Sequence, residues 1–149
     1  DGYMVTGIYK VGNRKYLFME DGSMKTGWFK VDDTWYYISS DGELRAQWVK
    51  SLSNWYYVDV DGKMVTGYQT INGAKYYFAS SGLMQKDWFK INGEDYYAAS
   101  SGTIQAQWVK SGRNWYYVDT DGKMVTGDYI IDGKVNRFDN QGLWMNQIN

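Results

Sequence analysis

Glycine recurs at a fixed spacing along the chain, at positions 2, 22, 42, 62, 82, 102, 122 and 142. A constant period of this length predicts a repeat protein, in which each small unit packs on its neighbours. The period is too short for a helix-turn-helix repeat and suits a β-hairpin. We therefore expect a single repeat domain over 1–149, with units 1–20, 21–40, 41–60, 61–80, 81–100, 101–120 and 121–140 and a C-terminal cap at 141–149.

The composition excludes several kinds of chemistry. The chain has 15 Tyr, 8 Trp and 5 Phe but no Pro, Cys or His. Without His and Cys it can build neither a Ser-His-Asp or Cys-His catalytic group nor the usual zinc site. Its net charge of -1 gives no sign of nucleic-acid binding, and no apolar run is long enough for a membrane span. We expect the chain not to be an enzyme and to bind no cofactor or metal. Because residue 1 is already in phase with the repeat, we also expect a processed or truncated piece of a longer protein.

The second half of each unit has the pattern of two short strands around a tight turn. In unit 21–40, Trp28 to Val31 and Thr34 to Ile38 flank Asp32-Asp33, where other units have Asn-Gly or Asp-Gly. These dipeptides are typical of two-residue hairpin turns. Pairing across the turn puts unit position 8 opposite 17 and 9 opposite 16. Positions 9, 11, 16 and 18 then share one face, predicted to be the core, and positions 8, 10, 15 and 17 share the other.

A second period, three units long, overlies the first. Units three apart are more alike than adjacent units, and 41–60 matches 101–120 best. Either three hairpins complete one turn of a superhelix or a block of three units was duplicated. Both interpretations stay open, and they are compatible.

Aromatic residues gather on the second face, with Trp at unit positions 8 and 15 and Tyr at 17. Gaps between such faces suit a methylated ammonium group, which is attracted to aromatic ring faces. They also suit sugar rings, and a purely structural role is a further alternative. Lysines share this face and either contact a ligand phosphate or lie solvated along the tryptophans: Lys30, Lys50, Lys90 and Lys110.

The motifs resemble those of a known family. Trp28, the segment Trp35-Tyr36-Tyr37 and the repeated Asp-Gly-x-Met-x-Thr-Gly of 21–27, 61–67 and 121–127 are similar to the choline-binding repeats of Gram-positive surface proteins and phage lysins. The resemblance covers essentially the whole chain. It implies an all-β fold, a left-handed solenoid of β-hairpins with about three hairpins per turn.

The resemblance also implies a function. It predicts a secreted, non-catalytic module that attaches non-covalently to the bacterial cell wall by binding choline or phosphocholine on teichoic or lipoteichoic acid. Association of two copies through the terminal repeats is a further implication. The alternatives are a module that binds glucan or host glycans, and an adhesin or structural spacer that binds a host protein.

Choline sites in that family lie between successive hairpins, between two aromatic residues of one unit and a tyrosine of the next. Mapping this pattern onto the chain predicts two complete cages, Trp28, Trp35 and Tyr57, and Trp48, Trp55 and Tyr77 with Met64 as a candidate fourth wall. Two further sites are predicted to be weaker, Trp88 and Tyr117 around Asp95, and Trp108 and Trp115 facing Arg137. Lys15 and Lys75 replace a ring in units 1–20 and 61–80 and break the pattern there.

Two acidic motifs have simpler interpretations. The sequences 59–62 and 119–122 resemble fragments of a calcium loop but lack the downstream bidentate Glu, so we expect them to form turns. The paired carboxylates Asp32-Asp33 and Glu94-Asp95 lie at predicted hairpin turns rather than in a cleft, which argues against glycoside hydrolysis.

Overall fold

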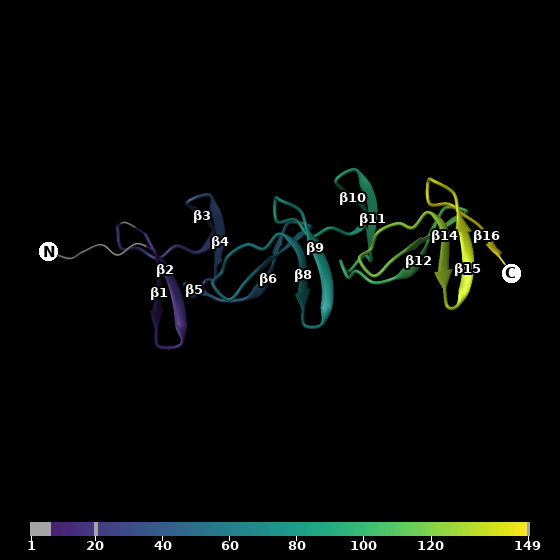
Figure 1. The fold of residues 1–149 in the computed structure, drawn as a ribbon. Helices are drawn as coiled ribbons and strands as arrows, with labels where there is room; N and C mark the ends of the chain where they lie inside the picture. The colour runs from purple at the N-terminus through teal and green to yellow at the C-terminus, as the bar shows by residue number, and fades with distance from the viewer. Residues whose placement is uncertain (1–6, 20, 149) are drawn as a thin grey trace. The chain divides into compact units, whose positions relative to one another are not determined.

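A computed structural model describes residues 7–19 and 21–148, and the secondary structure of this part of the chain is entirely β (Figure 1). No helix of the described residues is long and apolar enough to cross a membrane. The strands are β1 (Gly7–Val11), β2 (Arg14–Phe18), β3 (Gly27–Val31), β4 (Thr34–Ile38), β5 (Glu43–Leu44), β6 (Gln47–Ser51), β7 (Asn54–Val58), β8 (Gly67–Ile71), β9 (Ala74–Phe78), β10 (Asp87–Ile91), β11 (Glu94–Ala98), β12 (Gln107–Ser111), β13 (Asn114–Val118), β14 (Gly127–Ile131), β15 (Lys134–Phe138) and β16 (Trp144–Ile148).

Each repeat contributes one antiparallel hairpin with the predicted register. In β3–β4, Trp28 pairs with Tyr37 and Lys30 pairs with Trp35, which are the expected 8/17 and 10/15 pairs. The turn residues Asp32 and Asp33 both have positive φ, 48° and 65°. Positive φ at both central positions defines the turn that matches the twist of a hairpin and explains the Asn-Gly and Asp-Gly dipeptides of the other units.

Backbone hydrogen bonds fasten four of the hairpins to the repeat two places further along the chain. The N–H of Met64 donates to the carbonyl of Trp35 at 2.9 Å, and the N–H of Met84 donates to that of Trp55 at 2.8 Å. The same bond recurs at 3.0 Å between Met124 and the carbonyl of Asp95. Unit position 4 is thus held against position 15 of the unit two places earlier, which brings together side chains of units that are not adjacent in the sequence.

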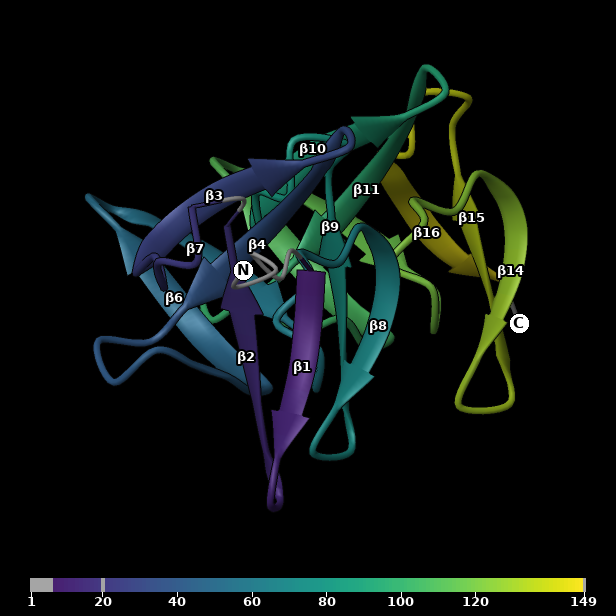
Figure 2. The same cartoon turned by 90° about the vertical axis from the view of Figure 1, so that its left-hand side faces the viewer.

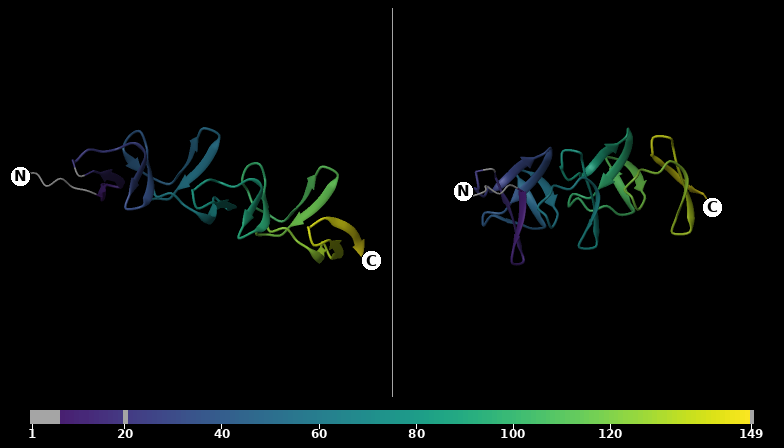
Figure 3. Two further views of the ribbon diagram at one scale, coloured as in Figure 1. Left: turned by 90° about the horizontal axis from the view of Figure 1, so that it is seen from above. Right: turned by 60° about the vertical axis from the view of Figure 1, so that its left-hand side comes forward.

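The chain divides into two compact units. The first comprises 1–67 and 78–84, and the second comprises 68–77 and 85–149. Within the first, the hairpins β1–β2, β3–β4 and β6–β7 point in different directions (Figure 2). The separate hairpins of both units can be followed from two other sides in Figure 3.

Small clusters of buried side chains hold the hairpins together. In the first compact unit Leu17, Ile38 and Leu44 are buried, with Phe29 and Tyr36 packed against them. Unit position 18 is the most consistently buried position of the hairpins, because it faces inward in every repeat from 21–40 onward: Ile38, Val58, Phe78, Ala98, Val118 and Phe138. The sequence pattern therefore identified position 18 as core, but not the whole core face: Leu17, at position 17, is buried on the face predicted to be aromatic, whereas Val11 of the predicted core face is 61% exposed.

The recurrent glycine is required both by the backbone conformation of the turn and by the packing of a neighbouring side chain. At Gly82, with φ +87°, a Cβ atom would lie 2.3 Å from the Sδ atom of Met64. At Gly142, with φ +85°, it would lie 2.3 Å from the Sδ atom of Met124. No side chain fits at such a distance, so glycine leaves the space in which the methionine of an earlier unit lies.

Candidate binding site: aromatic cages

Two tryptophans of one hairpin form a corner. Trp28 of β3 and Trp35 of β4 lie on the same face of the hairpin because positions 8 and 15 are diagonal neighbours across the strands. Their ring centroids are 6.4 Å apart and their planes meet at 86°. The ring of Tyr37, directly opposite Trp28, packs edge-on against it at 5.3 Å. The two indoles thus present two nearly perpendicular ring faces.

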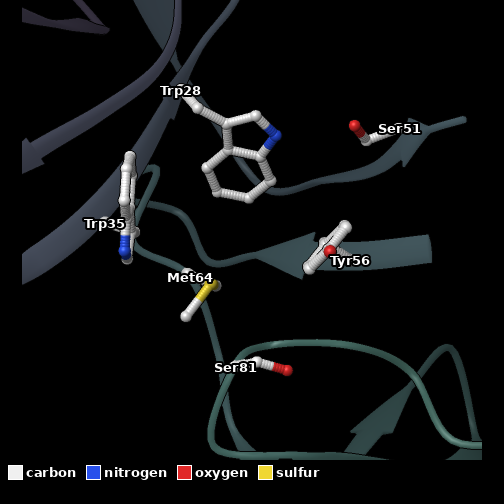
Figure 4. A pocket seen from close by; sticks show the side chains of 6 residues that line it. All are labelled: Trp28, Trp35, Ser51, Tyr56, Met64 and Ser81. Carbon is white, nitrogen blue, oxygen red and sulfur yellow. The ribbon is translucent and has the colours of Figure 1, made fainter. Parts of the chain in front are cut away.

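The following units close this corner into a cage. The ring of Tyr56 lies 5.4 Å from that of Trp28 at 72°, and Met64 approaches from below in the view of Figure 4. Together with Ser51 and Ser81 these residues line a hollow of about 330 Å³, at the small end of ligand sites, which span roughly 300–1,000 Å³. We call the set Trp28, Trp35, Tyr56 and Met64 the Trp28 cage.

The third wall of the Trp28 cage differs from the prediction. Tyr57 does not line the hollow; its ring contacts Trp48 of its own hairpin at 5.1 Å. Position 17 shares a face with position 8 of the same hairpin, whereas position 16 lies on the opposite face and can reach the preceding unit. The sequence held a signal for this, since Tyr also recurs at position 16: Tyr16, Tyr36, Tyr56, Tyr76, Tyr96 and Tyr116.

Met64 also belongs to a different cage from the predicted one. We expected it beside Trp48 and Trp55, but it lines the hollow of Trp28 and Trp35. The cause is the backbone bond from Met64 to the carbonyl of Trp35, which fixes the methionine next to that indole. Met84 has the equivalent bond to Trp55 and is the methionine next to that residue.

The second predicted cage has the same tryptophan corner. Trp48 and Trp55 lie 6.2 Å apart at 88°, and Phe78 packs on Trp48 at 5.8 Å. Tyr77 belongs to the second compact unit, where it packs against Tyr68 at 4.9 Å and stacks on Phe89 at 5.6 Å. A cage of Trp48, Trp55 and Tyr77 stays a prediction.

A hollow near the C-terminus is built from tryptophans. Trp108 and Trp115 form the usual corner at 6.4 Å and 85°, and Trp144 of β16 supplies a third wall 6.2 Å from Trp108 at 86°. The three residues line a hollow of about 330 Å³. Trp144 is held by its Nε1–H, which donates to the side-chain oxygen of buried Asn136 at 3.0 Å.

Trp144 escaped the sequence prediction because it lies in the cap, outside the phase of the aromatic positions. Arg137, which was predicted to face Trp108 and Trp115, does not line this hollow. Its Nε–H donates to Asp128 at 2.9 Å, directly across the β14–β15 hairpin. This bond lowers the pKa of the Asp128 carboxyl below its usual value. The ion pair keeps the guanidinium on its own hairpin.

The Trp88 site also uses position 16 rather than position 17. Tyr116 lies 5.5 Å from Trp88 at 75°, whereas the predicted partner Tyr117 contacts Trp108 at 5.2 Å. Asp95 replaces the second tryptophan and accepts a hydrogen bond from the ammonium of Lys90 at 2.8 Å.

The two lysines that break the pattern form ion pairs of the same kind. Lys75 lies 5.8 Å from the ring centroid of Tyr68 and donates to the carboxylate of Asp121 at 3.0 Å. Lys15 pairs with Asp61, and the two are 46 residues apart in the sequence, as are Lys75 and Asp121. The aromatic face of β8–β9 therefore carries a cation of its own, as expected from the sequence.

The lysines at position 10 are exposed and lie along the tryptophans, as one of the two interpretations of the sequence predicted. The ammonium groups of Lys30, Lys50 and Lys110 are 5.9, 5.7 and 5.7 Å from the ring centroids of Trp35, Trp55 and Trp115. This geometry is that of a cation–π contact. The position 15 tryptophan of each of these three corners thus has a positive charge beside its ring.

The acidic motifs form turns. The side chain of Asp59 accepts from the backbone N–H groups of Asp61 at 2.9 Å and Lys63 at 3.0 Å. Asp119 makes the same two bonds to Asp121 and Lys123. Over residues 7–19 and 21–148, no three acidic residues converge as metal ligands. The turn interpretation explains both motifs.

Family models and solved structures identify the family. A model described as a choline-binding repeat matches residues 5–48 and 65–107, more than half of the chain. A second, for a cell wall binding repeat, matches 47–64 and 107–124. The chain therefore belongs to the choline-binding repeat family, and it is a repeat region of the kind that serves as a cell-wall and choline-binding module. Among curated proteins, none matches significantly.

Similar solved structures have the β-hairpin solenoid fold. Choline binding protein F from Streptococcus pneumoniae has a TM-score of 0.81 at 27% identity, over 95% of this chain and 52% of that one. The same protein in the presence of a peptidoglycan analogue has a TM-score of 0.80 at 28% identity, with the same coverage. The pneumococcal cell wall endolysin from phage Cp-1 complexed with choline has a TM-score of 0.57 at 29% identity, over 80% of this chain and 37% of that one. The chain thus spans about half the length of choline binding protein F.

Proposed function

We propose that this chain is a non-catalytic module that docks on choline or phosphocholine groups of teichoic or lipoteichoic acid, and that all its repeats act as one binding domain. The observation that carries the proposal is the Trp28 cage, in which two perpendicular indoles, a tyrosine and a methionine surround one hollow. A quaternary ammonium offers the diffuse positive charge and the methyl groups that such walls attract.

The ring geometry favours a cation over a sugar. A sugar ring stacks on a flat aromatic platform with polar groups around it. Here the planes of Trp35 and Tyr56 lie at 86° and 72° to that of Trp28, and the three rings line one hollow. The hollow at Trp108 and Trp115 repeats this convergence with Trp144 as the third wall. These angles also argue against a purely structural spacer, which needs no concave aromatic surface.

A single cage is expected to bind weakly. Each ring contributes roughly 0.5–2 kcal/mol of cation–π attraction before the ligand loses its hydration, which suggests a Kd on the order of 1 mM. Attachment to a wall then depends on several cages engaging one polymer, because a second contact forms at high effective concentration. This multivalent use is consistent with a non-covalent position on the bacterial surface.

The position 10 lysines suit the anionic part of the ligand. Lys30, 5.9 Å from the ring centroid of Trp35, carries a charge that attracts the phosphate of a choline held in the Trp28 cage. Association of two copies through the terminal repeats is a further part of the proposal. Sedimentation velocity with and without choline tests it, and a monomer under both conditions counts against it.

The test of the main proposal is a titration of tryptophan fluorescence with choline, with α-glucan oligosaccharides as the parallel arm. We expect a saturable response to choline only. Trp35→Ala and Trp115→Ala each remove one corner wall and should lower the number of bound cholines by one in equilibrium dialysis. A saturable glucan response without a choline response would support the carbohydrate alternative and refute the proposal.

A further inference from the structure

The Trp28 cage has a counterpart three repeats later in the sequence. Trp88 and Tyr116 lie 5.5 Å apart at 75°, against 5.4 Å and 72° for Trp28 and Tyr56. Met124 bonds to the carbonyl of residue 95 at 3.0 Å, as Met64 bonds to that of residue 35 at 2.9 Å. Both methionines pack against a glycine where a Cβ atom would lie 2.3 Å from the sulfur. The frame of the site is therefore preserved.

One wall of this second frame has a different chemistry. Residue 95 is an aspartate where residue 35 is a tryptophan, and it pairs with Lys90 across β10–β11 as Trp35 pairs with Lys30. The side chain therefore emerges on the face that carries Trp88. A neutral ring face is replaced by a carboxylate, which accepts hydrogen bonds and carries a full negative charge.

The carboxylate changes which ammonium fits. A quaternary ammonium has no N–H and gains only attraction between charges from Asp95, while it loses one ring face. An ammonium with one N–H and two methyl groups donates a charge-assisted hydrogen bond to the carboxylate and still presents methyl groups to Trp88 and Tyr116. Asp95 therefore favours an ammonium with an N–H group, whereas the Trp28 cage is expected to favour a quaternary ammonium.

The present partner of Asp95 is exchangeable. Lys90 donates to its Oδ1 at 2.8 Å, but the two side chains are 65% and 41% exposed. Exposed pairs of this kind contribute little net stability, so a ligand ammonium can displace the lysine at small cost. Lys90 acts as a competitor and sets the affinity rather than closing the site.

We propose that Trp88, Asp95, Tyr116 and Met124 form a second kind of cage, which binds protonated tertiary or secondary methylamines in preference to choline. The inference rests on the proposed function, because it assumes that the frame shared with the Trp28 cage binds ammonium groups. It assigns a different ligand class to the Trp88 site, so that one chain recognises two states of amine methylation.

The test uses the methionines as local reporters. With ¹³C-labelled methyl groups on the seven methionines, the Met64 signal reports the Trp28 cage and the Met124 signal reports the Asp95 cage. Met64→Leu and Met124→Leu assign the two signals. The protein is titrated with choline and, separately, with N,N-dimethylethanolamine, which differs from choline by one methyl group replaced with a proton.

We expect the Kd measured at Met64 to be lower for choline, and the Kd measured at Met124 to be lower for N,N-dimethylethanolamine. The difference at Met124 should be about fivefold, the effect of one exposed charge-assisted hydrogen bond. Equal or greater choline preference at Met124 would overturn the inference while leaving the proposed function intact. Absence of any Met64 response to choline would instead defeat the proposed function.

Three variants test the role of the carboxylate. Asp95→Asn should remove the amine preference at Met124 without changing the Met64 response, and Asp95→Trp should make Met124 prefer choline as Met64 does. Lys90→Ala removes the competitor and should tighten amine binding, whereas the matched Lys30→Ala should not produce an amine preference at Met64. An amine preference that persists in Asp95→Asn would show that the carboxylate is not its cause and would overturn the inference.

Discussion

The side-chain amide of Gln47 donates a hydrogen bond to the hydroxyl of Ser39 at 2.8 Å, in a place where Ser39 is 5% exposed. Three repeats later Gln107 has the equivalent position, but Ala99 replaces the serine. The Nε2 atom of Gln107 is buried and, among the described residues, has no hydrogen-bond partner. A buried donor without a partner costs free energy.

Restoring the serine should therefore stabilise the second compact unit. We expect Ala99→Ser to raise the free energy of unfolding by about 1 kcal/mol, the net value of a typical hydrogen bond. Urea denaturation followed by circular dichroism measures the change. Ser39→Ala is the matched control and should destabilise the first compact unit by at least as much, because it leaves Gln47 without its partner. A decrease in stability for Ala99→Ser would contradict this account.

Substitution of Gly82 should be more costly than substitution of a glycine with a similar backbone and open surroundings. Gly82 and Gly27 have φ +87° and +80°, but a Cβ at Gly27 meets no atom within 4 Å. Both Gly→Ala changes share the strain of a left-handed residue, about 1–3 kcal/mol. We expect Gly82→Ala to cost roughly 1–3 kcal/mol more because Met64 must move, as measured by thermal unfolding. The double variant Gly82→Ala, Met64→Ala should recover part of this loss, and no recovery would mean that the methionine contact is not the cause.

The two adjacent tyrosines 56 and 57 should have separable effects on the Trp28 cage. Tyr56→Ala removes a wall and should weaken choline binding there about three- to tenfold, in line with roughly 0.5–2 kcal/mol per ring. Tyr57→Ala leaves that cage lined as before and should change its Kd less than about twofold, since Tyr57 contacts Trp48 instead. The Met64 methyl shift during a choline titration distinguishes the two. The opposite ranking would restore position 17 as the third wall.

Trp144 should be needed for one choline site and for the order of the C-terminal strand. Trp144→Ala opens the hollow of Trp108 and Trp115 and leaves Asn136 without the indole donor. We expect one fewer bound choline per chain in equilibrium dialysis. Met145→Ala is the control, because Met145 is 56% exposed and does not line the hollow. An unchanged number of sites in Trp144→Ala would exclude this hollow as a choline site.

The hairpins and their register could be predicted from the sequence because local rules determine them. The turn dipeptides and the alternation of side chains set the pairing of Trp28 with Tyr37. The same rule also placed Asp128 opposite Arg137, so that ion pair could have been predicted. The tryptophan corners follow directly from this pairing.

The remaining walls depend on how one hairpin turns against the next. Alternation shows that Tyr56 and Tyr57 lie on opposite faces, but it does not show which face meets the preceding unit. That relation is fixed by backbone bonds such as the one from Met64 to Trp35. Any residue except proline can make such a bond, so the bond by itself does not require a particular residue type. Trp144 was missed for another reason. It stands at unit position 4, where other units have a methionine, and its pairing with Phe138 repeats that of Met124 with Val118, so the aromatic positions 8, 15 and 17 gave no sign of it.

The origin of the cage walls has a mechanical consequence. The Trp28 cage takes its walls from β3 and β4, from β7 and from the segment after β7, so a ligand there touches three successive repeats. Under the proposed function, an ammonium group bound there would be a reversible cross-link between these repeats. A force that separates these repeats would then also have to break the contacts to the ligand. The affinity for the ligand and the force needed to extend these repeats are therefore expected to increase together.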